Sequence, residues 1–215
     1  MDRIEELLRD YQTLRSEIES RISHFEELWR KGSEHDLFKE AVFCLFTPQS
    51  KAVSCWRAVE LLDEGGLIYE GEPEAVSETI RGLVRFHRVK AENLVLLRQL
   101  FVKNGSPCIR EIIGRFPDAR RARRWLVENV RGYGLKEASH FLRNIGFGLD
   151  LAIVDRHILR CMKDLGIIEK VPGNLSYSRY LEIESLLKEF SSKVGIPFAH
   201  LDLLFWAKKV GFVFK

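Results

Sequence analysis

Apolar residues recur along most of the chain at the spacing of one face of an α-helix, which predicts helices rather than strands. The longest apolar stripe stops before Gly32, a residue type that commonly ends helices. Its members are Ile4, Leu7, Leu8, Tyr11, Leu14, Ile18, Phe25 and Leu28. No stretch alternates between apolar and polar residues over a convincing strand length, and there is no internal repeat. The pattern therefore predicts an all-α protein.

Short polar signals divide the rest of the chain into further helices. Ser33 followed by Asp36 is a typical helix start, and Thr47-Pro48 resembles another, with proline at the first helical position. Asn104-Gly105 is interpreted as the end of a helix. The predicted helices cover residues 33–45, 49–62, 73–82, 90–102, 118–130, 135–145, 158–165, 180–194 and 197–208.

The composition is that of an ordinary globular protein. Of the 215 residues, 46% are hydrophobic and 30% are charged, and the net charge of +3 permits nucleic-acid binding through local patches without requiring it. No apolar run approaches the ~18 residues that suggest a membrane helix, and the charged N-terminal segment lacks the apolar region of a secretion signal. We therefore expect an intracellular protein with one domain or two small lobes.

The four cysteines are widely separated, at Cys44, Cys55, Cys108 and Cys161. They lack the C-x₂-C spacing of zinc and iron–sulfur sites, and each lies among apolar neighbours. We expect buried, reduced thiols, no metal and no cofactor.

A tight turn is predicted between two helices in the middle of the chain, at Gly132-Tyr133-Gly134. Glycine adopts positive φ without steric cost, so two glycines around one residue favour such a turn. Backbone N–H groups at the start of the second helix attract phosphate together with the helix dipole. The sequence thus predicts a helix–hairpin–helix in which Gly132 and Gly134 contact a nucleic-acid backbone.

Two residues near this hairpin can carry chemistry. Lys136 lies in the first turn of the second helix, and its amine is a candidate nucleophile. Asp155 follows it by 19 residues (155 − 136) and precedes the apolar positions of the next helix, which its carboxylate can cap. Taken singly, a lysine that contacts phosphate and a plain helix cap also explain the two residues.

The segments Gly132-Tyr133-Gly134-Leu135-Lys136 and Val154-Asp155-Arg156-His157 together resemble the signature of the helix-hairpin-helix-GPD DNA glycosylases. Two more segments resemble motifs of endonuclease III-like members, namely Leu45-Phe46-Thr47-Pro48-Gln49-Ser50 and Phe86-His87-Arg88-Val89-Lys90-Ala91-Glu92-Asn93. The resemblance implies a single glycosylase unit over residues 1–215, with two helical lobes flanking a DNA-binding groove. The lobes would hold about residues 48–134 and residues 1–47 plus 135–215. The absence of a C-terminal four-cysteine cluster points to a branch without an iron–sulfur cluster.

In the members of this superfamily that also cleave the strand, a lysine stands at the position of Lys136 and an aspartate at that of Asp155. The resemblance implies that Lys136 attacks C1′ of the sugar while Asp155 supports the positive charge that develops there. The amine then forms a Schiff base, which acidifies the C2′ proton so that the 3′ phosphate can be eliminated.

Other residues are candidates for DNA contact. Gln49 resembles the residue that relatives push into the gap left by the extruded base, with an ordinary exposed glutamine as the alternative. His140 and Arg143 share the helix face of Lys136 and are candidates to line the groove or bind the DNA backbone, although a structural role explains His140 equally well. A basic run before the hairpin is either a solvated helix face or a source of salt-sensitive DNA affinity. It consists of Arg120, Arg121, Arg123 and Arg124.

The C-terminal residues indicate which base is removed. Flipped purines commonly stack between aromatic side chains, for which Trp206 and Phe86 are candidates, although core packing explains either residue. The ending Val210-Gly211-Phe212-Val213-Phe214-Lys215 resembles the type-2 8-oxoguanine DNA glycosylase/AP lyases of prokaryotes, in which the C-terminal lysine helps to distinguish 8-oxoguanine from guanine. 8-Oxoguanine carries a hydrogen on N7 where guanine has a lone pair, so a main-chain acceptor at Lys215 favours the lesion by about 1–3 kcal/mol. The same resemblance implies, by residue matching, that Asp202 also hydrogen-bonds the purine.

These observations predict a bifunctional enzyme that removes 8-oxoguanine from double-stranded DNA and cleaves the strand, as a cytoplasmic, nucleoid-associated monomer. Two other hypotheses stay open. The same fold can act on another damaged base, such as an oxidised pyrimidine or a mismatched adenine. Alternatively, the chain is a non-catalytic helix–hairpin–helix module that holds DNA for a partner.

Overall fold

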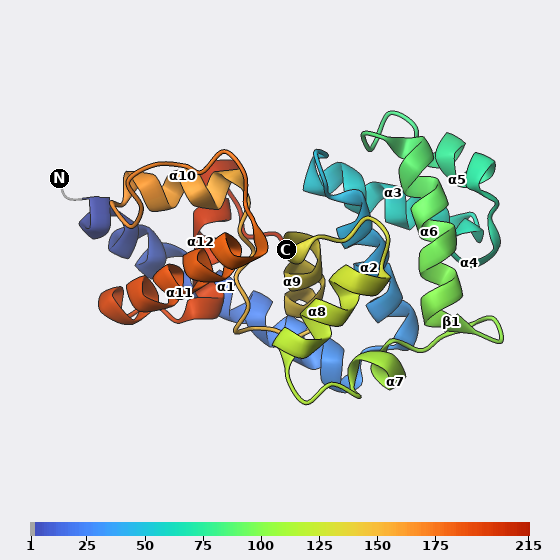
Figure 1. The fold of residues 1–215 in the computed structure, drawn as a ribbon, viewed down its shortest axis with the longest axis horizontal. Coiled ribbons are helices and arrows are strands. Elements are labelled where there is room, and N and C mark those ends of the chain that lie inside the picture. The colour runs from blue at the N-terminus through green and yellow to red at the C-terminus, as the bar shows by residue number, and fades with distance from the viewer. Residues whose placement is uncertain (1–2) are drawn as a thin grey trace. The chain divides into compact units, whose positions relative to one another are not determined.

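The computed structural model describes residues 3–215, and its secondary structure in that range is helical apart from one very short strand pair (Figure 1). The helices are α1 (Arg3–Lys31), α2 (Glu34–Phe46), α3 (Ala52–Glu64), α4 (Leu67–Glu70), α5 (Pro73–Ile80), α6 (His87–Phe101), α7 (Ile109–Ile113), α8 (Ala119–Asn129), α9 (Leu135–Asn144), α10 (Arg156–Asp164), α11 (Tyr177–Val194) and α12 (Phe198–Val210). The strands are β1 (Val102–Lys103) and β2 (Ser106–Pro107). The prediction of an all-α protein is confirmed. Among the described residues, no helix has the length and apolar character needed to cross a bilayer.

The chain divides into two compact units. Unit 1 holds the described residues up to Glu27 together with Leu142–Lys215, and unit 2 holds Leu28–Phe141. The expected lobes grouped residues 28–47 with the C-terminal third, whereas the structure includes them in unit 2. The reason is that α2 packs against α3, α6 and α7. The start of α9 also belongs to unit 2, because its first turn contacts other residues of that unit.

Helix α2 forms the centre of unit 2. It begins with the predicted cap: the Ser33 hydroxyl accepts a hydrogen bond from Asp36 N at 3.0 Å, and the Asp36 carboxylate accepts one from Ser33 N at 3.1 Å. Every residue from Leu37 to Phe46 except Lys39 is buried. A helix that is apolar on nearly all sides belongs in a protein core.

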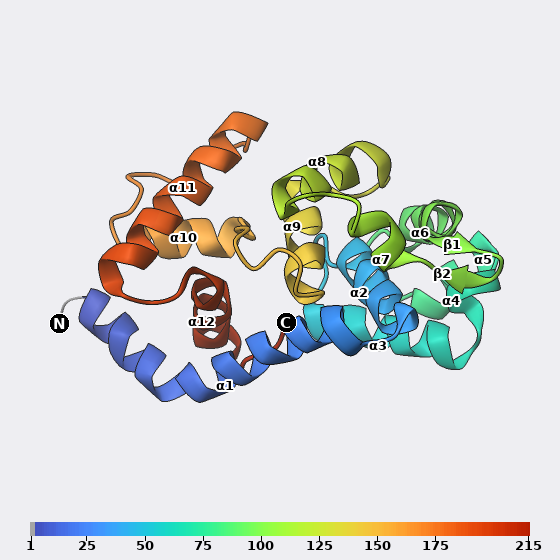
Figure 2. The same cartoon turned by 90° about the horizontal axis from the view of Figure 1, so that it is seen from below.

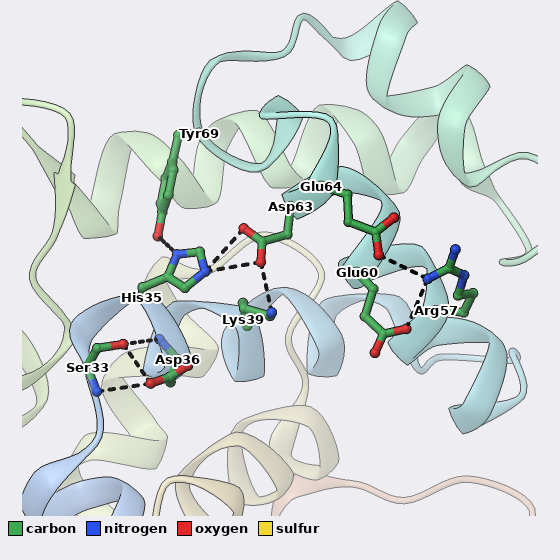
Figure 3. Close-up of polar contacts among 9 residues, drawn as sticks. All are labelled: Ser33, His35, Asp36, Lys39, Arg57, Glu60, Asp63, Glu64 and Tyr69. Atoms are coloured by element: carbon green, nitrogen blue, oxygen red, sulfur yellow. Dashed lines mark hydrogen bonds and ion pairs between the residues drawn. The ribbon is translucent and has the colours of Figure 1, made fainter.

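A polar cluster ties the start of α2 to α3 and α4 (Figure 3). The His35 ring lies between two partners: Nδ1 is 2.6 Å from the Tyr69 hydroxyl, and Nε2 is 3.1 Å from the Asp63 carboxylate. Lys39 Nζ donates to the same carboxylate at 2.8 Å and lies over the Trp56 ring. Burial raises the pKa of Tyr69 to about 12. The phenol therefore stays protonated, and the cluster joins the three helices as a structural clamp.

In unit 1, α12 lies beside both α10 and α11, as the two ribbon views show (Figures 1 and 2). The first part of α1 joins this group through polar contacts. The Tyr11 hydroxyl is 2.9 Å from Nδ1 of His200, at a buried position. Lys208 of α12 pairs with Glu6 at 3.1 Å and also with Asp10. Unit 1 is thus held together by residues from the two ends of the chain.

Two local predictions are wrong. Thr47-Pro48 does not start a helix, because Thr47 is the C-cap of α2 and its hydroxyl donates to the Cys44 carbonyl at 2.9 Å; α3 begins only at Ala52. Asn104-Gly105 follows α6 as the turn of a β-hairpin that joins β1 and β2. Its φ angles of 51° and 75° are those that a two-residue hairpin turn requires at both positions.

Candidate active site

The predicted helix–hairpin–helix is present, with α8 and α9 joined by residues 130–134. Only one of the two glycines supplies the positive φ that the sequence suggested for both. Gly132 has φ of 97°, whereas Gly134 is not among the residues with positive φ. Gly134 instead precedes α9, where its N–H donates to Oε2 of Glu137 at 3.0 Å. The start of α9 therefore holds an internal carboxylate, the kind of group that a helix N-terminus favours.

The hairpin is fixed to the rest of unit 2 at two points. The hydroxyl of the buried Tyr133 donates to the Ala41 carbonyl of α2 at 2.7 Å. On α6, Asn93 lies so close to Gly132 that a Cβ atom on the glycine would come within 2.6 Å of Asn93 Nδ2. The segment that resembles the endonuclease III motif thus supports the hairpin directly.

Lys136 lies in the first turn of α9, as predicted. Its Nζ donates to the Thr47 hydroxyl at 3.1 Å and lies 3.5 Å from Oε1 of Glu137. The Lys136 side chain is 22% exposed, and that of Glu137 is 14% exposed. The amine is therefore oriented by two neighbouring groups, and the side chain that carries it stays partly exposed, which leaves it available as a nucleophile.

Residues 47–50, called here the 47–50 loop, lie between α2 and α3 and are held by a second lysine. Lys90 Nζ donates to the Phe46 carbonyl at 2.6 Å, the Pro48 carbonyl at 2.8 Å and the Ser50 hydroxyl at 3.0 Å. Burial lowers the pKa of Lys90 to about 8, and the neighbouring Lys136 also lowers it. The loop is thus organised by a lysine that lies 40 residues beyond Ser50 in the chain.

The 47–50 loop is also connected to the start of α6. The Ser50 hydroxyl accepts a hydrogen bond from Arg85 N at 2.9 Å. Gln49, which precedes Ser50, and Phe86, which follows Arg85, adopt positive φ values of 56° and 57°. Such values are uncommon for residues with a side chain and mark strain that the surroundings must hold. Gln49 is exposed and Phe86 is 54% exposed, so both of these side chains are accessible.

Cys55 contacts the residue that precedes the 47–50 loop. Its Sγ donates to the Phe46 carbonyl at 3.2 Å, and its side chain is fully buried. Burial raises the pKa of Cys55 to about 11, although the positive charges of Lys90 and Lys136 oppose that shift. The thiol is therefore protonated at neutral pH.

In unit 1, Asp155 is the N-cap of α10. Its Oδ1 accepts hydrogen bonds from His157 N and Ile158 N, both at 2.8 Å. The cap was expected from the sequence, but the support behind it was not. The preceding segment is held by α11, where the Tyr180 hydroxyl accepts from Val154 N at 3.0 Å and donates to the Ala152 carbonyl at 2.8 Å.

Glu184, one turn further along α11, reinforces the same segment. Its Oε2 accepts a hydrogen bond from Ala152 N at 2.8 Å, and its side chain is buried. The segment that precedes Asp155 is therefore held through the backbone groups of Ala152 and Val154. Buried backbone groups need such partners, so satisfying them also orients the carboxylate that follows.

Trp206 is partly exposed and has a neighbour that the sequence did not single out. The His157 ring lies 5.1 Å from the Trp206 ring, and Nε2 of His157 is 2.8 Å from the Phe205 carbonyl. The ammonium of Lys209 lies over the same indole at 4.5 Å from its centre. His157 therefore links the helix start that carries Asp155 to the helix that carries Trp206.

Asp202 and Arg143 form an ion pair in unit 1, with Arg143 Nη2 3.3 Å from Oδ2 of Asp202. The guanidinium also lies over the Phe25 ring at 4.8 Å. Burial raises the pKa of Asp202, while Arg143 lowers it and Asp155 adds to the increase. Arg143 was predicted to line the groove or to bind the DNA backbone. Its side chain is only 3% exposed and is engaged with Asp202 and Phe25.

His140 is likewise buried, with its ring edge-on to Phe43 at 5.5 Å. This placement favours the structural alternative over a direct DNA contact. Lys215, the last residue, is partly exposed and follows Gly211, whose positive φ of 88° ends α12. The rings of Phe212 and Phe214 pack edge to face within this tail.

The basic run on α8 separates into two kinds of arginine. Arg123 is buried and its Nη1 lies 3.2 Å from the Ser139 hydroxyl of α9, so it packs the two hairpin helices together. Arg120, Arg121 and Arg124 are exposed. Only these three are available to bind a phosphate backbone.

The predicted residues thus form one group in each unit. Unit 2 brings the Lys136 amine to the 47–50 loop and also positions the hairpin, Gln49 and Phe86. Unit 1 places Asp155, Trp206, Asp202 and Arg143 on α9, α10 and α12 or at their ends. No role was predicted from the sequence for the residues that hold these groups in place, although three of them lie within the segments that resemble glycosylase motifs. The residues that hold the groups are Thr47, Lys90, Tyr180, Glu184 and His157.

Comparison with known proteins shows the family of the chain. A sequence profile described as 8-oxoguanine DNA glycosylase matches residues 18–196. The chain is 41% identical over 217 residues to the 8-oxoguanine DNA glycosylase/AP lyase of Korarchaeum cryptofilum, covering 99% of both proteins. It is 39% identical over 210 residues to the protein of that name from Fusobacterium nucleatum, covering 98% of this chain and 96% of the relative.

A solved structure shares the fold over nearly the whole chain. It is that of the Methanocaldococcus jannaschii 8-oxoguanine glycosylase/lyase in complex with a 15mer DNA containing 8-oxoguanine, with a TM-score of 0.85 and 34% identity. The alignment covers 98% of this chain and all of that one. The shared helical fold and the matching profile place the chain among the helix–hairpin–helix DNA glycosylases. Within that class, the chain belongs to the 8-oxoguanine DNA glycosylase family.

Proposed function

We propose that this chain removes 8-oxoguanine from double-stranded DNA and then cleaves the strand at the abasic site. The observation that carries the proposal is the placement of Lys136. Its amine lies at the start of the helix after the hairpin and donates to the Thr47 hydroxyl at 3.1 Å, and its side chain is partly exposed. Support for the substrate comes from relatives named 8-oxoguanine DNA glycosylase/AP lyase, to which the chain is similar over nearly its full length.

The proposed reaction begins when the neutral amine of Lys136 forms a bond from its nitrogen to C1′ of the nucleotide. The glycosidic bond breaks, and its electron pair leaves with the base, which takes up a proton. The nitrogen then gives up a proton, the bond from C1′ to the ring oxygen breaks, and that oxygen takes up a proton, which leaves a protonated Schiff base between Lys136 and C1′. A proton then leaves C2′, the bond to the 3′ phosphate breaks, and water finally releases the lysine from the sugar.

Two carboxylates have distinct proposed parts in this sequence. Glu137 Oε1, 3.5 Å from the amine, accepts the proton that the lysine must lose before it can attack. Asp155 stabilises the positive charge that develops on the sugar as the base departs. Both bonds of its helix cap are accepted by Oδ1, so Oδ2 is not used by the cap.

Recognition of the base is assigned to aromatic and tail residues. Trp206 and Phe86, both at least partly exposed, stack on the extruded purine. A main-chain acceptor at Lys215 receives the N7 hydrogen that distinguishes 8-oxoguanine from guanine. Asp202 hydrogen-bonds the same purine, and its pairing with Arg143 orients its carboxylate. Leaving the acceptor at Lys215 unpaired against guanine costs about 1–3 kcal/mol, so extrusion and chemistry must supply the rest of the selectivity.

The hairpin around Gly132 and Gly134 and the exposed arginines of α8 bind the phosphate backbone of the DNA. Gln49 enters the space that the extruded base leaves. We propose that the protein acts as a monomer, in the cytoplasm and in association with the nucleoid. Size-exclusion chromatography with and without a damaged duplex tests the oligomeric state.

Borohydride trapping tests the lysine mechanism. A duplex with a single 8-oxoguanine is incubated with the protein, and reduction of the Schiff base yields a covalent adduct. The wild type is expected to form the adduct and nick the strand, whereas Lys136→Ala forms none. Lys103→Ala, which changes an exposed lysine of the same unit, is the matched control and should behave as the wild type. Binding without an adduct on any damaged duplex would overturn the proposal in favour of a non-catalytic module.

The substrate is tested with duplexes that carry 8-oxoguanine, guanine, an oxidised pyrimidine or adenine opposite 8-oxoguanine. We expect nicking to be fastest on 8-oxoguanine. A variant that lacks Lys215 should lose much of the preference for 8-oxoguanine over guanine, by a factor of about 5 to 150, while still nicking a preformed abasic site. If this variant keeps the preference for 8-oxoguanine over guanine, Lys215 takes no part in recognition of the base.

A further inference from the structure

Lys90 is a buried cation that the proposed reaction does not use. It is 5% exposed, and its Nζ makes three hydrogen bonds, to the Phe46 carbonyl, the Pro48 carbonyl and the Ser50 hydroxyl. All three acceptors lie between residues 46 and 50. A single amine thus binds the backbone carbonyls of the residues before and after Thr47.

A buried lysine is costly for the folded state, because its charge is removed from water. The lowering of the Lys90 pKa to about 8 expresses this cost. An apolar side chain of similar length would fill the same space without this cost, but it would leave the Phe46 and Pro48 carbonyls without this donor. The lysine therefore serves the backbone of the 47–50 loop rather than the filling of the core.

The loop leads directly to the proposed nucleophile. The Thr47 hydroxyl donates to the Cys44 carbonyl at 2.9 Å and accepts from Lys136 Nζ at 3.1 Å. Its orientation is thus defined from two sides. Because Thr47 lies between the two residues whose carbonyls Lys90 binds, a shift of that backbone would move the Thr47 hydroxyl and with it the Lys136 amine.

We infer that Lys90 is a positioning residue, which holds the 47–50 loop so that Thr47 presents the Lys136 amine in the geometry needed for attack. The inference rests on the proposed function and adds a residue to it. Lys90 does not touch the DNA, and its effect reaches the reaction only through the loop.

Lys90→Met tests this, since methionine keeps the unbranched apolar stem and removes all three hydrogen bonds. The rate of Schiff-base trapping is measured under single-turnover conditions, at a temperature where circular dichroism shows every variant to be folded. We expect a loss of at least ~10-fold, because small misplacements of a reacting group can cost about 100-fold. The dissociation constant for an abasic-analogue duplex should change less than about 3-fold. Lys51→Met, at an exposed lysine beside the same loop, is the matched control and should leave both values unchanged.

A double-mutant cycle with Thr47→Val separates positioning from mere stability. If Lys90 acts through Thr47, Thr47→Val has little further effect on the trapping rate of a protein that already carries Lys90→Met. The inference would be overturned if the double variant lost the product of the two single losses in trapping rate. It would also be overturned if Lys90→Met were less stable but trapped at the wild-type rate. Ser50→Ala removes one of the three bonds and is used for the same measurements if Lys90→Met does not fold. A wild type that forms no adduct refutes the proposed function and this inference together, whereas an active wild type with unaffected Lys90 variants refutes the inference alone.

Discussion

Asn93 of α6 lies directly against Gly132 of the hairpin, so that the space a Cβ atom would need is already taken by Asn93 Nδ2, at 2.6 Å. Gly132 also has φ of 97°, a value that residues with a Cβ rarely adopt. Gly132→Ala is therefore expected to reduce the free energy of unfolding by at least about 2 kcal/mol, because both strain and a collision oppose it. Urea unfolding monitored by circular dichroism measures the change.

Gly134→Ala is the matched control for this prediction. A Cβ there would lie 3.2 Å from Glu137 Oε2, which is the end of a flexible side chain. We expect a loss of about 1 kcal/mol or less. Equal losses at the two glycines would show that the contact with Asn93 does not decide the shape of the hairpin.

Tyr180→Phe removes the hydroxyl that satisfies Val154 N and the Ala152 carbonyl. Two buried backbone groups then lose a partner, so the free energy of unfolding should fall by about 1–3 kcal/mol. Tyr177→Phe, at a 45% exposed tyrosine of the same helix, should have no measurable effect. If Tyr180→Phe is as stable as the wild type, the hydroxyl is not what holds the segment before Asp155.

Asp155→Asn separates the capping role of this residue from its proposed chemical role. Asparagine caps helices about as well as aspartate, so the free energy of unfolding should change by less than about 0.5 kcal/mol. The rate of base excision should nevertheless fall by about 100-fold or more, because the negative charge is removed. Asp118→Asn, at the N-cap of α8, is the control and should alter neither quantity. Full activity in Asp155→Asn would reduce Asp155 to a plain cap.

The exposed arginines of α8 should determine part of the salt dependence of DNA binding. Replacing Arg120, Arg121 or Arg124 by glutamine is expected to reduce the slope of log affinity against log salt by up to about 0.9 for each phosphate that the variant no longer neutralises. Arg115→Gln, at an exposed arginine near the end of α7, should leave the slope unchanged. Fluorescence anisotropy with a labelled duplex at several salt concentrations provides the measurement. A slope unchanged in all three α8 variants would make this helix face merely solvated.

The lowered pKa of Lys90 predicts a dependence of stability on pH. Below about pH 8 both the folded and the unfolded protein hold the Lys90 proton, so the folded state bears the full cost of the buried charge. Between about pH 8 and the usual pKa of 10.5 the unfolded chain still binds this proton whereas the folded chain has released it. Unfolding then takes up a proton, and the contribution of Lys90 to stability rises with pH.

The comparison of wild type with Lys90→Met isolates this effect, because other titrating groups largely cancel. Urea unfolding at neutral pH and at about pH 9.5 should shift the difference in free energy in favour of the wild type. A difference that is independent of pH would mean that Lys90 has its ordinary pKa. The Ser50 hydroxyl can accept from an ammonium or donate to a neutral amine, so the loop need not open when the proton leaves.

The parts of the fold and site that follow from local pattern were predictable. The capped start of α2 at Ser33, the two helices around the hairpin and the cap at Asp155 all depend on residues within a few positions of one another. The β-hairpin at Asn104-Gly105 also had a local signal, since this dipeptide favours a two-residue turn. It was interpreted as a helix end because the flanking strands are only two residues long.

The remaining features depend on partners that are distant in the sequence. Thr47 resembles a helix start, yet Lys90 and Lys136, each more than 40 positions away, bind the 47–50 loop in a non-helical shape. Arg123 resembles its exposed neighbours in the sequence, yet it is buried and donates a hydrogen bond to Ser139 on the facing helix. No single-sequence pattern encodes such pairings, because they arise when separate helices pack.

The burial of Cys55 has a chemical consequence for a protein of this family. With a pKa of about 11, only about one molecule in ten thousand carries a thiolate at neutral pH, and the thiolate is the form that peroxides attack. Cys161, with a pKa also raised to about 11 by burial, is protected in the same way. The sulfur atoms of these two residues are thus poor targets for the oxidants that damage guanine, so conditions that generate the proposed substrate would leave Cys55 and Cys161 reduced.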